Sequence, residues 1–418
     1  MTVHEVSSIV KEHLDTINIG CFQGFDRPLL LISNHYPGVW LEHVYDSVFY
    51  ALQDRTKLYL AENTVNLFIS YQKEDGQLPC FILDKGNANF KSYRCPEGVG
   101  YAQTQEVVSF AKLCMMVYRM NEDKQFLQKI YDASKRWADW LKAKRMTRGE
   151  GLVEMFVGYD TGHDNSGRLD GLSCIGNFQI DGVMQNAAIL PPGDPVAPVI
   201  AVDMNCNFFA TLIALSDMAK ELGREAEAAD WRKQAAEVKK KLIALCFNEE
   251  DCYFYDVDKN GNQRKYLSCT IFHLFMEGVL DPQEDARLIS ALYRRHISNP
   301  EEFAAPYPYP SMAMNDPSFE THKGPNSWGY MSFGLTALRA TLWMDQYGYK
   351  KEFDHLCRIW VDVLTKYFDE RKMGQGIDPI TGVPTKLSEW YSSTMLFYLY
   401  AVNRLGLNSA GAAKEKGC

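Results

Sequence analysis

The chain has no stripe of basic residues and no long apolar run. Its net charge is −9, with 53 acidic against 44 basic residues. Binding to a nucleic-acid backbone needs clustered positive charge, so we expect no nucleic-acid partner. No stretch reaches the roughly 18 apolar residues that cross a bilayer, and the polar first eleven residues do not resemble a secretory signal. We therefore expect no membrane association.

Paired cysteines and spaced metal ligands are also missing. The eleven cysteines are an odd number, lie singly, and form no CxxC pair. Several of them, including Cys114, Cys206 and Cys246, fall in apolar helical stretches. This pattern is typical of reduced, buried thiols, so we expect a cytoplasmic protein. The nine histidines lack the spacing of zinc ligands, so we expect no metal and no cofactor.

No Ser/Gly-rich linker divides the chain. A length of 418 residues alone would suggest two or three domains, and a hydrophobic content of 46% is ample for a large core. Since the same pattern continues throughout, we expect one domain over residues 1–407. The polar segment 408–418 is expected to be a disordered tail.

Helical periodicity fills most of the sequence. From Asp203 to Leu222 apolar side chains recur at steps of three and four, and Gly223 ends the stretch. A second such stretch follows from Ala228 to Leu245, so the two form a helical hairpin. About six such pairs are expected. The predicted helices cover 3–17, 41–52, 57–72, 107–120, 126–140, 204–222, 228–245, 267–276, 284–293, 331–345, 353–367 and 389–402.

Long segments rich in Gly, Pro, Asn and aromatic residues separate the pairs. A compact domain rarely keeps such loops without a use. A closed ring of six hairpins accounts for both features, so we predict an all-α fold, an (α/α)6 toroid with long loops at one face. The loops are 18–40, 73–102, 145–202, 247–266, 296–327 and 369–388.

One of these loops imitates a calcium site. Asp256, Asp258 and Asn260 match the start of a calcium-binding loop, but Leu267 stands where a bidentate Glu is required. The flanks 252–255 and 263–266 look like short strands. A small β-hairpin closed by Asn-Gly is the better interpretation.

Acidic and aromatic residues cluster at four junctions between loop and helix. The longest loop holds two carboxylates and one arginine between Gly162 and Asp170. Each cluster alone could consist of capping or solvated residues, but four clusters at the same kind of junction favour one shared pocket. The other three are 39–49, 323–328 and 374–391.

Five short motifs in these clusters resemble glycoside hydrolase family 63 in order and spacing. The likeness runs over most of residues 35–405 and is nearest to the short mannosylglycerate and glucosylglycerate hydrolases. Trehalases are more distant relatives. The motifs are Tyr45–Phe49 (W-D-S-x-F), Asp164–Asp170 (D-N-S-P-R-x-D, with Gly167 for Pro), Asp203–Asn205 (D-L-N), Gly324–Trp328 (G-P-x-W, with one extra residue) and Gln375–Gly382 (E-x-Y-D-P-x-T-G).

The resemblance implies a toroidal α-glycosidase that inverts the anomeric carbon. In that chemistry one carboxylic acid protonates the leaving oxygen, and a carboxylate across the sugar activates water. The family's acid corresponds to Asp164, whose pKa burial would raise. Sugar-holding roles fall to Asp46, Arg168, Asp203 and Trp328, and we expect Trp40, Tyr45, Gln103, Glu389 and Trp390 to complete the pocket.

The sequence departs from the family at the expected base, where Gln375 replaces Glu. An amide can position water but cannot accept its proton. Three explanations stay open. The chain is a Glu→Gln variant that traps substrate, or another acid such as Glu389 or Asp378 serves, or the protein no longer hydrolyses and has another role.

The predicted activity is hydrolysis of a small intracellular glycoside, a disaccharide or glycosyl-acid, and the predicted partner is therefore a small carbohydrate. One alternative is a sugar-binding protein without turnover. Another is a sugar isomerase or epimerase on the same fold, for which His163 and His322 would be the paired proton carriers.

Overall fold

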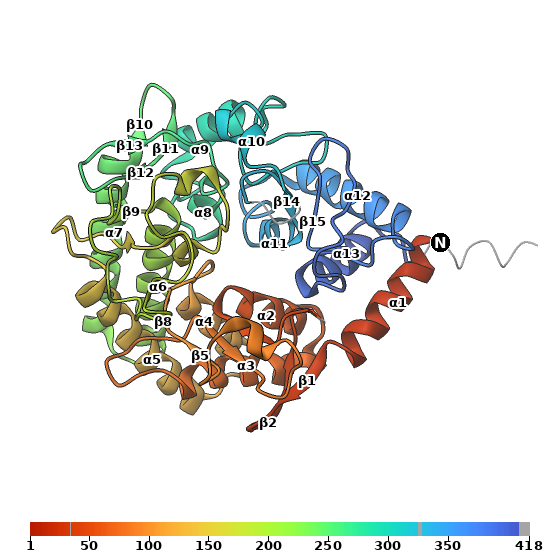
Figure 1. Ribbon diagram of the computed structural model, residues 1–418, viewed down its shortest axis with the longest axis horizontal. Helices are drawn as coiled ribbons and strands as arrows, with labels where there is room; N and C mark the ends of the chain where they lie inside the picture. The colour runs from red at the N-terminus through yellow and green to blue at the C-terminus, as the bar shows by residue number, and fades with distance from the viewer. Residues whose placement is uncertain (34, 325–327, 409–418) are drawn as a thin grey trace, which may run out of the picture.

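The chain is arranged as a ring of helices (Figure 1). The computed structural model describes residues 1–33, 35–324 and 328–408. Helices alternate along the chain between an inner and an outer ring, which confirms the predicted all-α toroid. The inner helices are α2 (Val44–Gln53), α4 (Phe110–Asn121), α6 (Val202–Glu221), α8 (Ile271–Met276), α11 (Gly334–Arg339) and α13 (Ser392–Arg404).

The outer helices cover the gaps between the inner ones. The ring closes where α13 packs against both α2 and the N-terminal helix α1, although these lie at opposite ends of the sequence. A short extra helix, α10 (Pro317–Thr321), lies in a loop. The outer helices are α1 (Val3–Thr16), α3 (Leu58–Ser70), α5 (Lys124–Lys144), α7 (Glu225–Cys246), α9 (Ala286–Leu292) and α12 (Lys350–Lys366).

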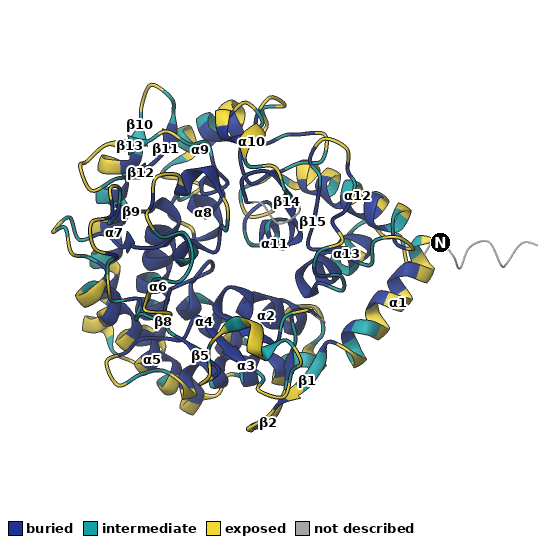
Figure 2. Ribbon diagram, in the orientation of Figure 1, coloured by how far each residue is buried: buried dark blue, intermediate teal, exposed yellow. Residues whose placement is uncertain are grey.

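Burial separates the two rings (Figure 2). In α2 every residue from Val44 to Ala51 is buried. A covering helix needs only one apolar stripe, and in α7 the buried residues are those spaced three, four or seven apart: Ala228, Trp231, Ala235, Val238, Leu242 and Cys246.

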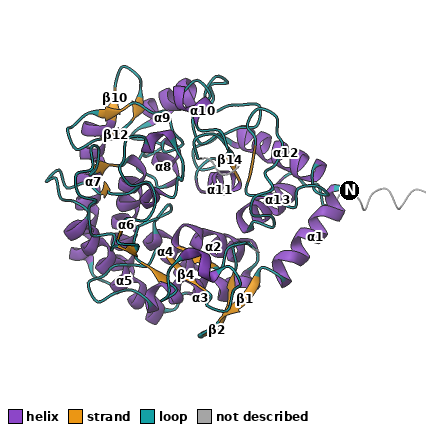
Figure 3. Cartoon of the chain, in the orientation of Figure 1, coloured by secondary structure: helices purple, strands orange, loops and turns teal. Residues whose placement is uncertain are grey.

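Short strands lie within the loops and form small antiparallel sheets of two to four strands (Figure 3). They are β1 (Ile19–Phe22), β2 (Phe25–Leu30), β3 (Gly38–Trp40), β4 (Phe81–Leu83), β5 (Val99–Gly100), β6 (Glu154–Met155), β7 (Gln179–Ile180), β8 (Val183–Met184), β9 (Val199–Ile200), β10 (Phe247–Asn248), β11 (Tyr253–Phe254), β12 (Asp256–Val257), β13 (Gln263–Arg264), β14 (Ser332–Phe333) and β15 (Gly376–Ile377).

The predicted β-hairpin is present, with its first strand shifted. Strands β12 and β13 pair across the Asn-Gly turn, and the Asp258 carboxylate accepts hydrogen bonds from the backbone amides of Asn260 and Asn262. The predicted strand 252–255 is only partly right, because β11 pairs with β10 instead. Val257 also pairs with Ile200, which extends the hairpin into a four-stranded sheet.

Two inner helices are shorter than predicted. The residues just before α8 make a tertiary hydrogen bond in place of a helical one, since the Leu267 amide donates to Asp316 Oδ2 at 2.7 Å. Similarly, β14 takes the residues before Gly334, and a 3-10 turn over Ala340–Leu342 follows α11.

Within the described part of the chain, every helix is too short or too polar to cross a bilayer. Of the predicted tail 408–418, only Asn408 is among the described residues.

Close packing of β3 on β4 generates the first prediction. A Cβ at Gly38 would lie 2.2 Å from the carbonyl oxygen of Ile82 and 2.8 Å from Cα of Leu83, both backbone atoms. Since backbone yields less than a side-chain tip, we expect Gly38→Ala to lower the free energy of unfolding by about 3 kcal/mol in urea titration.

Gly20→Ala in β1 is the matched control. Its nearest neighbour would be the tip of the Leu31 side chain at 3.0 Å, so we expect a change below about 1 kcal/mol. Equal losses in the two variants would contradict the packing argument.

Candidate active site

Asp164 lies in the loop that follows the 3-10 turn Gly158–Thr161. Its backbone carbonyl accepts a hydrogen bond from the amide of Trp328 at 3.1 Å. Its Oδ1 atom is buried without a hydrogen-bond partner among the described residues. Burial raises the pKa of this carboxyl to about 7. A substantial fraction of Asp164 is therefore protonated near pH 7, as a proton donor must be.

Gln375 lies just before β15, which pairs with β14. The amide of Gly334 donates to its carbonyl, so this position is joined to the start of α11. The side chain is buried, and Oε1 has no hydrogen-bond partner within the described residues. A neutral amide in this place can orient water without accepting its proton.

Trp328 connects Asp164 to the strand pair beside Gln375. Its ring stacks on Phe333 of β14 with centroids 4.3 Å apart, and Phe333 is paired with Gly376. The other neighbour of the indole is His163, at 4.7 Å. Trp328 thus bonds to the backbone of Asp164 and stacks on the strand that pairs with the residue after Gln375. Residues 325–327 of the predicted G-P-x-W segment lie outside the described residues.

Arg168 and Asp203 meet in a buried ion pair. Nη1 and Nη2 of Arg168 donate to the two oxygens of Asp203 at 2.6 and 3.0 Å. Its Nε donates to Asp256 at 2.8 Å. Burial opposes ionisation of Asp203, but the guanidinium prevails and holds its pKa below the usual range. Both residues are engaged with each other, so here they brace the pocket wall.

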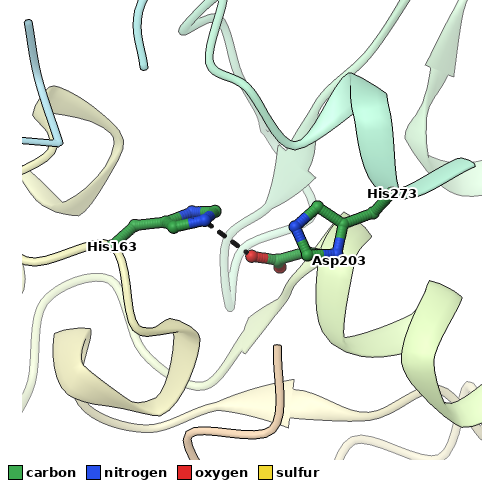
Figure 4. A group of neighbouring side chains, drawn as sticks. All are labelled: His163, Asp203 and His273. Carbon is green, nitrogen blue, oxygen red and sulfur yellow. Dashed lines mark ion pairs between the residues drawn. The ribbon is translucent and has the colours of Figure 1, made fainter. Parts of the chain in front are cut away.

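A group of possible metal ligands stands beside this ion pair. His163, Asp203 and His273 point toward one another, and their ligand atoms all lie within 4.8 Å (Figure 4). Two histidines and a carboxylate can bind zinc or iron. However, Nη1 of Arg168 lies 2.6 Å from Asp203 Oδ2 and 3.2 Å from His163 Nδ1. A bound dication would face this permanent charge, so the residue set does not fit a metal.

Asp46 and Tyr45 are held inside the ring. Oδ2 of Asp46 accepts hydrogen bonds from Ser392 at 2.5 Å and from Ser393 at 2.7 Å, and Oδ1 is buried without a partner within the described residues. Burial raises the pKa of Asp46 to about 6 despite these bonds. The hydroxyl of Tyr45 bonds to Thr341 at 2.6 Å. These contacts join α2 to α13 and to the end of α11.

Trp40 is the last residue of β3, and Gln103 lies in the loop after β5. The Trp40 ring contacts Tyr36 and Tyr93, with centroids 5.2 and 5.4 Å away. Nε2 of Gln103 donates to Gln105 at 2.6 Å, while its Oε1 is buried without a partner among the described residues.

Glu389 and Trp390 have partners outside this group. Glu389 accepts a hydrogen bond from the amide of Lys372, and Trp390 stacks on His13 of α1 at 3.9 Å. The Trp390 ring face is therefore occupied by the N-terminal helix. The candidate base Asp378 accepts from Tyr330 and from the amides of Ile380 and Thr381, so its carboxylate closes a turn.

Sequence analysis missed Glu42 and Arg339, which are buried beside the predicted residues. Glu42 accepts a hydrogen bond from Gln105 at 3.0 Å, and its backbone carbonyl accepts one from Arg339. The signal was present in the cluster 39–49, where motif matching selected Asp46 instead. For Arg339 no local motif gave a signal.

Several residues discussed above have buried polar atoms without a hydrogen-bond partner among the described residues. Native proteins leave few such groups unpaired, so these atoms are candidates to bind a polar ligand. A sugar presents hydroxyls that can both donate and accept. The atoms are His43 Nδ1, Asp46 Oδ1, Gln103 Oε1, Asp164 Oδ1, His273 Nδ1, Arg339 Nε and Gln375 Oε1.

The ion pair of Arg168 gives the second prediction. Replacing Asp203 by Asn leaves the guanidinium without its bidentate partner, so we expect the free energy of unfolding at pH 7 to fall by about 3–5 kcal/mol. Because the pKa of Asp203 is lowered in the fold, this contribution is present above about pH 4 and is lost as the pH falls further.

Urea titration of Asp203→Asn beside Asp170→Asn measures this effect. The half-exposed Asp170 pairs with His322 at 3.0 Å, and we expect its loss to change stability by at most about 1 kcal/mol. A stability of Asp203→Asn equal to that of the control would show that the pair does not brace the fold.

Comparison with known proteins relates the chain to glycosidases. A model of the mannosylglycerate hydrolase MGH1-like glycoside hydrolase domain matches residues 42–394. An uncharacterized protein of Borreliella burgdorferi is 20% identical over 279 residues, which are 66% of this chain and 50% of that protein. The chain thus aligns with about half the length of this curated relative.

Solved structures show the same fold. The family 63 mannosylglycerate hydrolase of Thermus thermophilus, in complex with Tris, is 16% identical; the match covers 94% of this chain and 99% of that one, with a TM-score of 0.73. The same enzyme in complex with glucose is 17% identical, and the match covers 94% of this chain and 99% of that one with a TM-score of 0.71. Neutral trehalase Nth1 of Saccharomyces cerevisiae is 14% identical, and the match covers 99% of this chain and 82% of that one with a TM-score of 0.69.

The family model covers most of the toroid, including the loop of Asp164 and the strands beside Gln375. The chain belongs to the mannosylglycerate hydrolase MGH1-like family of glycoside hydrolases.

Proposed function

We propose that the protein hydrolyses a small α-glycoside inside the cell, with inversion at the anomeric carbon and Asp164 as the acid. One observation carries the proposal: the buried carboxyl of Asp164 has a pKa of about 7, and its Oδ1 has no hydrogen-bond partner among the described residues. Such a carboxyl is protonated in a substantial fraction of molecules near pH 7 and can give its proton to a leaving oxygen.

The reaction needs a donor and a water molecule on opposite sides of the sugar. Asp164 protonates the glycosidic oxygen as its bond to the anomeric carbon breaks. Water attacks from the other face, and the unpartnered Oε1 of Gln375 accepts one of its hydrogen bonds. In inverting enzymes the two carboxyls lie about 6.5–9.5 Å apart to admit that water.

Ligands of a related enzyme support a small substrate. The Thermus enzyme was solved with glucose in one structure and with Tris and D-glycerate in another, and we propose a disaccharide or glycosyl-acid here. The described cysteines are all free thiols, which supports a reducing compartment.

The two alternatives receive unequal support. Gln375 favours sugar binding without turnover, since an amide cannot replace a base. The isomerase alternative is weaker, because His322 bonds to Asp170 and the ring facing His163 is that of His273. Burial holds the pKa of both His163 and His273 far below the usual value, which suits neither as a proton carrier.

Replacing Asp164 tests the proposal. We expect Asp164→Asn to lower kcat for the best substrate in a screen of α-linked disaccharides and glycosyl-glycerates by about a thousandfold, because the leaving oxygen loses its proton donor. Sugar affinity, measured by calorimetry, should change little. NMR of the first product formed identifies the anomer.

Asp170→Asn, six residues along the same loop and half-exposed, is the control and should keep full turnover. Turnover unaffected by Asp164→Asn would rule out Asp164 as the acid. Tight sugar binding by a natural chain with no turnover at all would support the sugar-binding alternative.

A further inference from the structure

Glu42 presents its carboxyl to the loop that carries Asp164. It lies on the 3-10 turn Leu41–His43 between β3 and α2. A Cβ at Gly162 would be only 2.5 Å from its Oε2, so only glycine leaves room for this carboxyl. Two residues of chain span at most about 7 Å, so the Glu42 carboxyl lies within about 11 Å of the Asp164 Cα. This bound is compatible with the separation of about 6.5–9.5 Å between the two carboxyls of inverting enzymes.

A chain of side-chain hydrogen bonds orients Glu42. Gln103 donates to Gln105 at 2.6 Å, and Gln105 donates to Oε2 of Glu42 at 3.0 Å. Gln105 takes a left-handed φ of 42°, a strained conformation for a non-glycine residue. On the other side, His43 Nδ1 faces Oε1 at 3.5 Å, and its Nε2 bonds to the Tyr391 hydroxyl at 2.5 Å. Such second contacts fix a reacting group in place.

Other acids near the site are already engaged. Arg168 holds Asp203, two serines hold Asp46, and Asp378 closes its turn. The carboxyl of Glu389 accepts from a backbone amide. Within the described residues, the Glu42 carboxyl accepts one hydrogen bond closer than 3.5 Å, from Gln105. It is also the carboxyl whose charge interacts with that of Asp164.

The groups around Glu42 keep its affinity for a proton high. Burial raises its pKa to about 8; Arg339 and the hydrogen bond from Gln105 oppose this, while Asp164 and Asp46 add to it. Two neighbouring acids with similar pKa values can share one proton. The form of the pair that reacts is the one in which Asp164 keeps this proton and Glu42 is ionised.

We propose that Glu42 is the general base of the proposed hydrolysis, in place of the residue that Gln375 replaces. The inference rests on the proposed function. The bond from the anomeric carbon to the leaving oxygen breaks, and that oxygen takes the proton of Asp164. Water oxygen bonds to the carbon and passes its proton to the Glu42 carboxylate, with Gln375 holding the same water.

Glycosyl fluorides separate the base from the acid. Fluoride leaves without a proton, so on α-glucosyl or α-mannosyl fluoride Asp164→Asn should keep most of its turnover. Glu42→Gln should lose about a thousandfold in kcat, because no group takes the proton of water. Sodium azide, which needs no base, should restore turnover to Glu42→Gln and yield the inverted β-glycosyl azide by NMR.

Glu106→Gln is the matched control. Glu106 is equally buried, and burial raises its pKa to about 7, but its oxygens accept from the Phe110 amide and the Trp137 indole. We expect its turnover on the fluorides to stay within about threefold of the natural chain, since it lies outside the reaction. Circular dichroism checks that Glu42→Gln folds, and Glu42→Asp, which keeps a shortened carboxylate, should retain more turnover than Glu42→Gln.

A readout without substrate tests the pairing itself. In protein labelled with 13C at the aspartate carboxyls, the Asp164 signal is assigned by its loss in Asp164→Asn. Its titration midpoint should fall in Glu42→Gln, because the neighbouring negative charge is gone.

The outcomes separate the two proposals. Full turnover by Glu42→Gln, loss without azide rescue, or an unmoved Asp164 midpoint would each overturn Glu42 as the base and leave Asp164 as the acid. A gain of a hundredfold or more in Gln375→Glu would do the same, since it would show that the natural chain lacks a base. If the natural chain turns over neither fluoride nor any glycoside in the screen, the proposed hydrolysis itself fails.

Discussion

The buried guanidinium of Arg168 is the constraint on which the site depends. It binds Asp203 at the start of α6 and Asp256 in β12, and it lies four residues after Asp164 in the same loop. A long loop would otherwise sample many conformations, and ordering it is entropically unfavourable. Three charge-assisted hydrogen bonds to two distant elements fix the loop against the inner ring.

The same ion pairs neutralise the charge of Arg168 in the loop of Asp164. An unpaired guanidinium close to a carboxyl stabilises its ionised form and lowers its pKa. The pKa of Asp164 is instead raised to about 7, by burial. The arginine also stands beside His163 and Asp203, where its charge opposes a bound cation.

The sequence predicted the toroid because helical periodicity is strong and recurs along the chain. It failed at α8 and α11, where tertiary hydrogen bonds to Asp316 and strand pairing of β14 override local helical preference. The hairpin was expected from Asn-Gly, but its register depends on β9, which lies far away in sequence.

For the site, the motifs gave the stretches but not every side chain. Asp164 and Gln375 carry oxygens without a partner among the described residues. In the cluster 39–49, Asp46 is bound to two serines, whereas Glu42 faces the Asp164 loop. Glu42 lies on the 3-10 turn before α2 and Asp46 lies in α2, and a local motif does not show which of the two acids faces the loop. Contacts such as His163 with His273 are invisible in sequence.

The amide at 375 is consistent with a working site once charge is considered. Burial raises the pKa of three acids discussed above, Glu42 to about 8, Asp164 to about 7 and Asp46 to about 6. A further carboxylate close to them would repel their charges and raise these pKa values more, which would make an ionised base rarer. An amide can hold water by a hydrogen bond while adding no charge. Under the proposed mechanism, Gln375 therefore avoids a further rise in the pKa of Glu42.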